Sequence, residues 1–309
     1  MKYSIGIPAF KATYLKECID SILSQKFTDF ELIIVNDASP ENLDVIVDSY
    51  SDNRIRYFKN QKNFGAEHVV DNWNKCLSYA KGEYFVLMGD DDLMEPNYLE
   101  HFEELINSNP TIDIFHCRSY QIDEQSTKIS LTPVWAEFES VYDNILNRMQ
   151  HGRLQYISDF VYKTITLRQN KGFYKLPLAW GSDDISSYIA MGNQGVVHTN
   201  TPLFCYRISS ITISKSGSEK RKLIAYKSYE EWLFQFLKQV PNNLEDQLLR
   251  ENIKVHFYPF FKRKRIITLK KSFSSKSLEM LIFWMRNLRE YNLKLDEVII
   301  AFFRFLFKK

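Results

Sequence analysis

The chain has 309 residues, of which 45% are hydrophobic, enough to build the core of one large domain with an appendage or of two modest domains. The formal net charge of +2 conceals an asymmetry, because residues 251–309 hold 14 of the 40 basic side chains but 5 of the 38 acidic ones. The acidic body argues against nucleic acid as a partner, whereas the basic and aromatic tail predicts an anionic surface such as membrane phospholipid.

The cysteines and the apolar stretches indicate a cellular location. The four cysteines are scattered without a CxxC pair, so neither a zinc site nor a disulfide framework is expected. The N-terminal sequence MKYSIGIPAF lacks the apolar run of a secretory signal, and the stretch Val298–Phe307 is about half of the ~20 residues that a spanning helix needs. We therefore expect a cytoplasmic protein, at most peripheral on the inner face of the membrane.

The first 120 residues alternate between two hydrophobic periods. Apolar runs predict strands at 3–7, 30–35, 55–58, 84–88 and 112–117, and helical spacing predicts helices at 15–23, 43–50, 69–80 and 98–106. Strand–helix alternation of this kind predicts an α/β fold with a mainly parallel sheet that is covered by helices on both faces.

Three polar segments follow predicted strands directly. Pro8 follows the first, Asp37 the second, and the cluster Asp90–Asp92 the fourth. In open α/β sheets, ligands bind beyond the carboxyl ends of the strands, so these segments are expected to meet in one crevice.

The rest of the chain has a different pattern. Residues 138–211 mix short helices and strands, and after Ser218 the periodicity is helical. We expect a catalytic domain at 1–215 and a helical, basic and aromatic extension at 216–309.

The cluster Asp90-Asp91-Asp92 is the main chemical signal. The sequence contains neither GxGxxG nor GxxxxGK[ST], so phosphate must be held by other means. Carboxylates are hard oxygen ligands for Mg²⁺ or Mn²⁺, and such an ion bridges pyrophosphate oxygens. The alternative is a helix N-cap, although a cap needs one acid and three adjacent carboxylates repel each other.

Four segments occur in the order and spacing of a known family: IPAF, SILSQKFTDFELIIVNDAS, the NFG and AKGEY run, and GDDDLMEP. The chain resembles the family-two, GT-A-fold inverting glycosyltransferases over roughly residues 1–215. The resemblance implies a GT-A-like mixed, mainly parallel sheet flanked by helices, with the C-terminal helical extension added to it. It also implies a nucleotide-sugar donor and a divalent metal.

The resemblance also carries over nucleotide-binding residues. It places Pro8, Ala9, Phe10 and Asp37 at the base and Asn63 and Gly65 on the nucleotide side. A carboxylate can accept the uracil imide N–H, and an aromatic ring offers a stacking face. The alternatives are a core ring for Phe10, a turn residue for Asp37 and an ordinary turn at Asn63–Gly65.

The resemblance makes Asp91 the principal metal ligand, with Asp90 and Asp92 as flanking ligands. Gly89 replaces the first acid of the usual pattern, which leaves the division of roles among the three open.

The pair Asp183-Asp184 matches the acids that supply the general base, with Asp184 as first choice and Asp183 as second. A helix cap is the alternative for this pair. Trp180 is expected to stack on a sugar or to pack in the core, and Arg207 is expected at the surface.

The sequence therefore predicts a metal-dependent inverting glycosyltransferase that moves a sugar from a UDP donor to the hydroxyl of a glycan or lipid-linked acceptor, in surface polysaccharide or glycolipid assembly. The rivals are a nucleotidyltransferase that makes sugar nucleotides and a non-catalytic binder of the same fold. The extension either touches an anionic membrane, packs on the body or self-associates.

Overall fold

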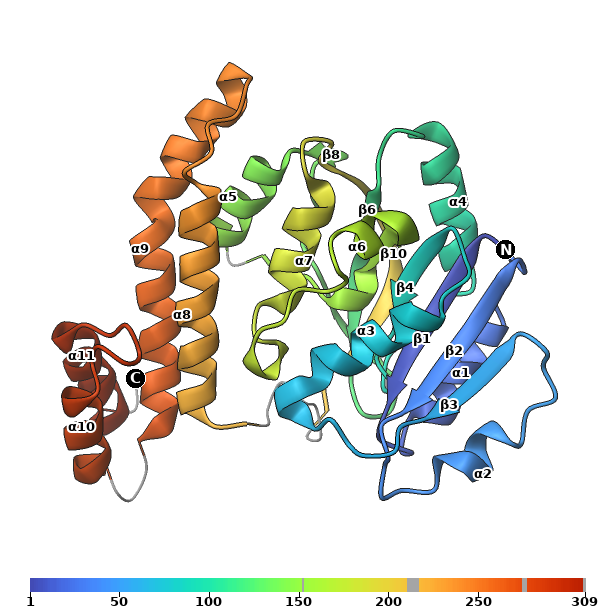
Figure 1. Ribbon diagram of the computed structural model, residues 1–309, viewed down its shortest axis with the longest axis horizontal. Coiled ribbons are helices and arrows are strands. Elements are labelled where there is room, and N and C mark those ends of the chain that lie inside the picture. The colour runs from blue at the N-terminus through green and yellow to red at the C-terminus, as the bar shows by residue number, and fades with distance from the viewer. Residues whose placement is uncertain (152, 210–216, 274–276, 308–309) are drawn as a thin grey trace.

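The computed structural model describes residues 1–151, 153–209, 217–273 and 277–307. Figure 1 shows an α/β body at one end and a helical C-terminal part at the other. The described elements are β1 Tyr3–Ala9, α1 Leu15–Leu23, β2 Phe30–Asn36, α2 Leu43–Val47, β3 Ile55–Lys59, η1 Ala66–His68, α3 Val69–Tyr79, β4 Tyr84–Leu87, β5 Leu93–Met94, α4 Tyr98–Ser108, β6 Ile114–Ile122, β7 Lys128–Leu131, β8 Phe138–Glu139, α5 Val141–His151, η2 Ile157–Asp159, β9 Phe160–Lys163, α6 Thr164–Gln169, η3 Pro177–Ala179, α7 Ser182–Met191, β10 Val196–Arg207, α8 Glu219–Phe236, α9 Leu244–Ser272, α10 Ser277–Arg286 and α11 Leu295–Leu306.

One mixed sheet forms the centre of the body. Its order is β3-β2-β1-β4-β9-β6-β10-β5, with β7 added beside β6 and β8 beside β10. The β3-β2-β1-β4 half is parallel, and β9 and β5 run antiparallel to their neighbours. The chain leaves β1 towards β2 and β3 and then returns to β4 on the other side, so the strand order reverses between β1 and β4. A ligand site is expected at this switch point.

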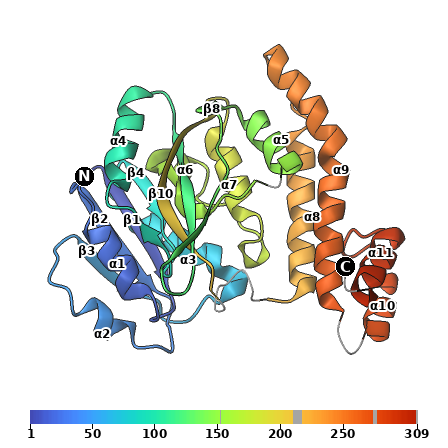
Figure 2. The ribbon, with the colours of Figure 1, turned by 180° about the vertical axis from the view of Figure 1, so that it is seen from behind.

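The sheet is buried on both faces, as the uninterrupted apolar strands predict. In β2, Leu32 and Ile34 pack on one face, while Ile33 and Val35 pack on the other. Successive strand residues point to opposite faces, so one run of apolar residues fills both cores. In Figures 1 and 2, α3 covers one face of this half and α1 the other.

The helices after residue 217 pack on the body and on one another. α9 contacts α5, α8 and α11, and Figures 1 and 2 both show α8 and α9 side by side. Tyr229, Leu233, Phe260 and Phe261 from these two helices belong to the same apolar cluster as Phe85 of β4. This part of the chain therefore shares a core with the sheet.

Three sequence-based details need correction or lie beyond the structure. The first strand continues through Pro8, which is paired in register with Val35, to Ala9. The fifth predicted strand continues to Ile122 and is paired with β7, in a region where no strand was expected. The expected domain boundary at 215 lies outside the described residues.

Two absences concern the described residues only. Their cysteines Cys18, Cys76, Cys117 and Cys205 are all buried and free, in agreement with the expectation of no disulfide. No helix in these ranges is both long and apolar enough to span a membrane.

Candidate active site

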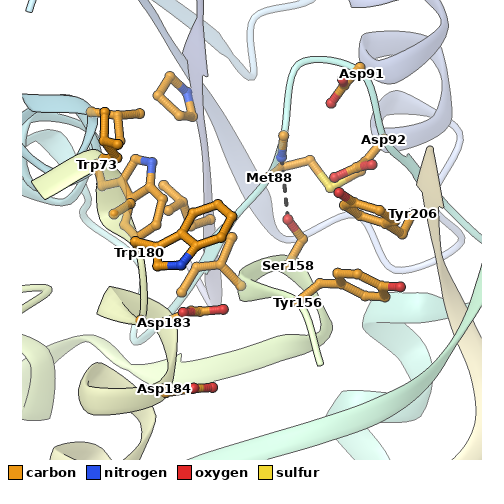
Figure 3. A pocket seen from close by; sticks show the side chains of 18 of the residues that line it. Trp73, Met88, Asp91, Asp92, Tyr156, Ser158, Trp180, Asp183, Asp184 and Tyr206 are labelled. Carbon is orange, nitrogen blue, oxygen red and sulfur yellow. Dashed lines mark hydrogen bonds between the residues drawn. The ribbon is translucent and has the colours of Figure 1, made fainter. Parts of the chain in front are cut away.

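A cavity of about 390 Å³ lies beyond the carboxyl ends of β1 and β4. Asp90, Asp91 and Asp92 line one part of it, and Asp183 and Asp184 line another (Figure 3). Two acidic groups that are almost 100 residues apart in the chain therefore share one cavity. Of the segments that the strand ends were expected to bring together, Pro8 and Asp90–Asp92 line this cavity and Asp37 does not.

Backbone amides fix the loop that follows β4. One Asp90 carboxylate oxygen accepts hydrogen bonds from the amides of Phe10 at 2.7 Å and Lys11 at 2.9 Å. Asp92 accepts from the amide of Arg207 at 2.9 Å. Burial, and next the charge of Asp91, raise the pKa of Asp90 to about 6, and the same two causes raise the pKa of Asp92. The hydrogen bonds that Asp90 and Asp92 accept thus join the loop after β4 to the ends of β1 and β10.

Arg207 is fully buried beneath this loop, so the expectation of a surface position was wrong. Its guanidinium donates to the carbonyl oxygens of Asp91 at 2.6 Å and Asp123 at 3.0 Å, and to the carboxylate of Glu17 at 3.0 Å. Such a fork of donors suits several acceptors at once. Arg207 therefore positions the backbone of the acidic loop. Thr212 and Ser214, which the family resemblance places in the same segment that closes over the donor, lie outside the described residues.

Asp91 also lines the cavity. Within the described part of the chain, its carboxylate has one side-chain partner, the Lys11 ammonium at 3.7 Å. Among the described residues, no three His, Cys, Asp or Glu side chains gather into a metal cluster. Mg²⁺ and similar ions bind through one or two carboxylates plus substrate phosphates, and Asp91 fits that arrangement.

Asp37, directly after β2, holds the loop that contains Asn63 and Gly65 through hydrogen bonds. The Asp37 carboxylate, which is buried, accepts from the Asn60 amide at 2.9 Å and from the Phe64 backbone amide at 3.0 Å. It thereby holds the loop that contains Asn63 and Gly65, where Gly65 has the positive φ of 69° that favours glycine. Asp37 therefore shapes this loop, and both of its carboxylate oxygens accept hydrogen bonds within the protein.

Pro8 lines the cavity, Ala9 is buried within β1, and Phe10 is half-buried. Within the described chain, Phe10 belongs to none of the apolar clusters, which weakens the core alternative for its ring. The cavity around Asp91 does not reach Phe10 or Asp37.

The two acids of α7 have different surroundings. Asp184 is buried and fully engaged, because one oxygen accepts from Arg148 at 3.1 Å and Gln155 at 2.8 Å, and the other accepts from the Tyr229 hydroxyl at 3.1 Å. No described side chain donates a hydrogen bond to the Asp183 carboxylate, which faces the cavity.

Burial raises the pKa of Asp183 to about 7, with the negative charge of Asp184 as the next cause. The charge of Arg148, a hydrogen bond from the Asp184 backbone amide and then the charge of Lys264 oppose this rise. A carboxyl group with a pKa near neutrality is suited to exchange protons during turnover.

The segment before α7 has an unusual backbone. Leu178, Ala179 and Gly181 have φ values of 58°, 55° and 97°. A Cβ on Gly181 would lie 2.7 Å from the Tyr229 ring, so glycine allows α8 to approach α7. Left-handed non-glycine residues cost about 1 kcal/mol or more each and gather at functional sites. This segment presents Trp180 to the cavity, as Figure 3 shows.

Several lining residues escaped the sequence analysis. Trp73 and Met88 pack in the apolar clusters, as their apolar character predicts, and they also line the cavity. Trp180, which the sequence analysis did single out, lines the cavity and packs against the core as well. Six other lining residues come from distant elements and carry no local motif: Arg148 of α5, Tyr156 and Ser158 at η2, Tyr226 and Tyr229 of α8, and Lys264 of α9.

Solved structures share this fold. Over the whole chain the structure is similar to that of S. aureus TarS residues 1–349 in complex with UDP-GlcNAc, with a TM-score of 0.70, 14% identity and 93% of that chain covered. It is also similar to the mannosyltransferase PcManGT from Pyrobaculum calidifontis in complex with GDP-Man and Mn²⁺, with a TM-score of 0.56 and 16% identity, over 88% of that chain. The fold is therefore of the GT-A class, as predicted.

The sequence places the chain within that class. The profile of Glycosyl transferase family 2 matches residues 4–173, so the chain belongs to this family of glycosyltransferases. Glycosyltransferase GlyG of Streptococcus pneumoniae is 27% identical over 69% of this chain and 73% of its own length. An uncharacterized glycosyltransferase of Rickettsia typhi is 34% identical over 40% of this chain, and the match spans 38% of that relative's length.

The unequal surroundings of Asp183 and Asp184 predict opposite effects on stability. The folded pKa of Asp183, about 7, exceeds the unfolded value of about 3.9, so its stabilising contribution is full below pH ~4 and is lost as pH rises through 7. Asp183→Asn should therefore raise the melting temperature relative to wild type at pH 8, by about 2–4 °C for each kcal/mol relieved, and by less at pH 5.

Asp184→Asn is the matched control and should be destabilising by about 3–5 kcal/mol, because it leaves the Arg148 charge buried without its partner. Thermal melting of both variants at the two pH values measures the contrast. Equal destabilisation by the two substitutions would contradict the assignment.

Proposed function

We propose that the protein transfers a sugar from a UDP-sugar to an acceptor hydroxyl with inversion at the anomeric carbon. The observation that supports this most is that Asp91 and Asp183 face one cavity while their neighbours Asp90, Asp92 and Asp184 are held by the protein. One acid is thus available on the donor side and another on the acceptor side.

The donor side is supported by the loop geometry and by the similar structures. Lys11 lies at the switch point beside Asp91, where phosphate oxygens of a nucleotide would lie. TarS was solved with UDP-GlcNAc and with UDP, and this favours uridine here. A Mn²⁺ or Mg²⁺ ion bound at Asp91 would supply positive charge to the departing diphosphate.

On the acceptor side, we assign the general base to Asp183 rather than to Asp184. The sequence alone favours the opposite order for the two acids. A base needs a free carboxylate oxygen within reach of the hydroxyl, and both Asp184 oxygens already accept hydrogen bonds. Asp183 would take the proton of the acceptor hydroxyl. The hydroxyl oxygen would attack the anomeric carbon from the face opposite the diphosphate, which leaves as UDP. Asp184 would position Arg148 and Tyr229 around Asp183.

The donor assignment is tested by calorimetric titration of UDP, GDP and ADP with and without Mn²⁺. We expect UDP to bind most tightly, and Asp91→Asn to weaken UDP binding about 10-fold or more in Mn²⁺ but little without it, because the carboxylate acts through the metal. Asp48→Asn changes an exposed acid away from the cavity and should have no effect. Equal binding of the three nucleotides would contradict the uridine assignment.

Hydrolysis of UDP-sugars in the same samples separates the rival functions. Asp183→Asn should lower turnover by about 10²–10⁴-fold while leaving UDP affinity unchanged. Metal-linked UDP binding without turnover of any sugar would instead favour a non-catalytic binder. Release of pyrophosphate from UTP and a sugar phosphate would favour a nucleotidyltransferase.

The pH dependence of kcat/KM follows from the raised pKa of Asp183. The base must be ionised, so kcat/KM should rise about tenfold per pH unit below pH ~7 and level off above it. The charged groups that face Asp183 are Asp184 on its own helix, Arg148 on α5 and Lys264 on α9. A flat profile between pH 5 and 8 would contradict the role of Asp183.

We place the reaction at the inner face of a membrane, in polysaccharide or glycolipid assembly. α10 leaves Leu278, Ile282 and Met285 exposed at helical spacing. α11 leaves a second stripe, made of Leu295, Ile299, Phe303 and Leu306. Arg286, Arg289, Lys294 and Arg304 of this helix pair are also exposed. Apolar stripes beside cations are typical of helices that lie on an anionic bilayer.

The part of the tail that carries this proposal is narrower than the sequence suggested. Phe260 and Phe261 are buried, and Arg265 is buried in ion pairs with Glu230 and Glu297. The segment around residues 257–265 therefore packs on the body, and α10 and α11 remain as the candidate surface.

Co-sedimentation with vesicles tests this surface. The full chain should bind phosphatidylglycerol-containing vesicles more tightly than pure phosphatidylcholine, and Ile299→Ser with Phe303→Ser should reduce binding about 10-fold or more, because two exposed apolar groups are lost. Val240→Ser, which changes a still more exposed apolar residue before α9, is the control. Concentration-dependent dimerisation without vesicle binding would show self-association instead.

A further inference from the structure

The C-terminal helices supply part of the cavity wall. Tyr226 and Tyr229 of α8 and Lys264 of α9 line the cavity that Asp183 faces. Lys264 lies in the last third of α9, a 29-residue helix that packs on α5 and α8, so its place is set by two helix contacts.

Four consecutive basic residues of α9, Lys262–Arg265, include Lys264. The other three contact acidic side chains or a carbonyl oxygen. Lys262 pairs with Asp296 at 2.6 Å, Arg263 donates to the Met149 carbonyl oxygen, and Arg265 pairs with Glu230 and Glu297. Lys264, in contrast, makes no ion pair with any carboxylate in the described ranges. Its ammonium lies 4.8 Å from the Phe260 ring centre and 5.4 Å from that of Tyr226.

The surroundings of Lys264 disfavour its charge. Burial, and next the positive charge of Arg148, lower the pKa of Lys264 to about 8, while Asp184 and Asp183 act in the opposite direction. Asp184 is already neutralised by Arg148. A partly buried ammonium without an ion pair, beside an open cavity, is the kind of group that an anionic ligand would complete.

We propose that Lys264 is the anion-binding residue of an acceptor subsite, so that the acceptor carries a phosphate or carboxylate group beside the hydroxyl that receives the sugar. The inference rests on the proposed transferase function, because that function makes the Asp183 side the acceptor side. The rings of Trp73 and Trp180, which also line the cavity, offer faces for a sugar or polyol of the acceptor. Lys264 thereby selects a charged acceptor over a neutral one.

Binding of simple oxyanions to the full chain tests this subsite without knowledge of the natural acceptor. Glycerol 1-phosphate is compared with glycerol, and glucuronate with glucose, by calorimetry at pH 7, constant ionic strength and without metal. We expect one of the two oxyanions to bind at least about 10-fold more tightly than its neutral counterpart, which is the size of one charge-assisted contact. The arm that responds identifies phosphate or carboxylate as the acceptor group.

Three variants assign the effect to Lys264. Lys264→Met should abolish the preference for the oxyanion and should fold, because its apolar chain fits against Phe260 and Tyr226; Lys264→Arg should keep the preference. Lys271→Gln removes an exposed charge from the same helix and should change nothing. Equal oxyanion binding by wild type and Lys264→Met, or no preference in wild type, would overturn the proposal.

UDP affinity in the same samples keeps the two proposals apart. Lys264→Met should leave UDP affinity unchanged within about 2-fold, and a loss as large as that for the oxyanion would place Lys264 on the donor side and overturn the acceptor assignment. Lys264-dependent oxyanion binding in a chain that binds no UDP would uphold the anion site and refute the proposed transferase.

Discussion

A carboxylate that leaves water needs a hydrogen-bonding partner, a positive charge or a proton, and this requirement organises the whole site. Asp90 and Asp92 take backbone amides, and Asp184 takes Arg148, Gln155 and Tyr229. These acids tie together strand ends and helices that are far apart in the chain. The protein thus satisfies these three acids, whereas Asp91 and Asp183 line the same cavity without a hydrogen bond from a described side chain.

The same requirement explains why the C-terminal helices cannot be regarded as an independent appendage. Tyr229 reaches Asp184 across a glycine at position 181 that leaves room for its ring. Apolar residues of α8 and α9, among them Leu233 and Phe261, lie in the cluster that contains the sheet residue Phe85. Removal of these helices would expose that core and leave an oxygen of Asp184 without its donor.

Much of the fold could be predicted from the sequence, because it depends on local periodicity. The strands β1 to β4 and the helices between them follow from apolar runs and helical spacing, and their parallel order places Asp90–Asp92 at the crevice. The long helix α9 was not predicted as one element, since Pro259 lies inside it and its exposed residues obscure the period. Tertiary packing, not propensity, keeps it continuous.

The site was predictable only where a residue type reports its own role. Clustered acids can be recognised in a sequence. Which of Asp183 and Asp184 is engaged by the protein, however, depends on Arg148, which lies on another helix. Arg207 gave no sign of burial, because its four acceptor groups come from segments up to 190 residues away. Such roles are set by the three-dimensional arrangement alone.

The wall of the cavity is built from two stretches of chain, one inside and one outside the match to the family. The match to the family ends at residue 173, after the donor-side acids and before Asp183, Tyr229 and Lys264. Likeness within the matched part therefore informs about the nucleotide half of the reaction. The wall formed by Asp183, Tyr229 and Lys264 lies outside that match, so membership of the family by itself does not define what this side of the cavity admits.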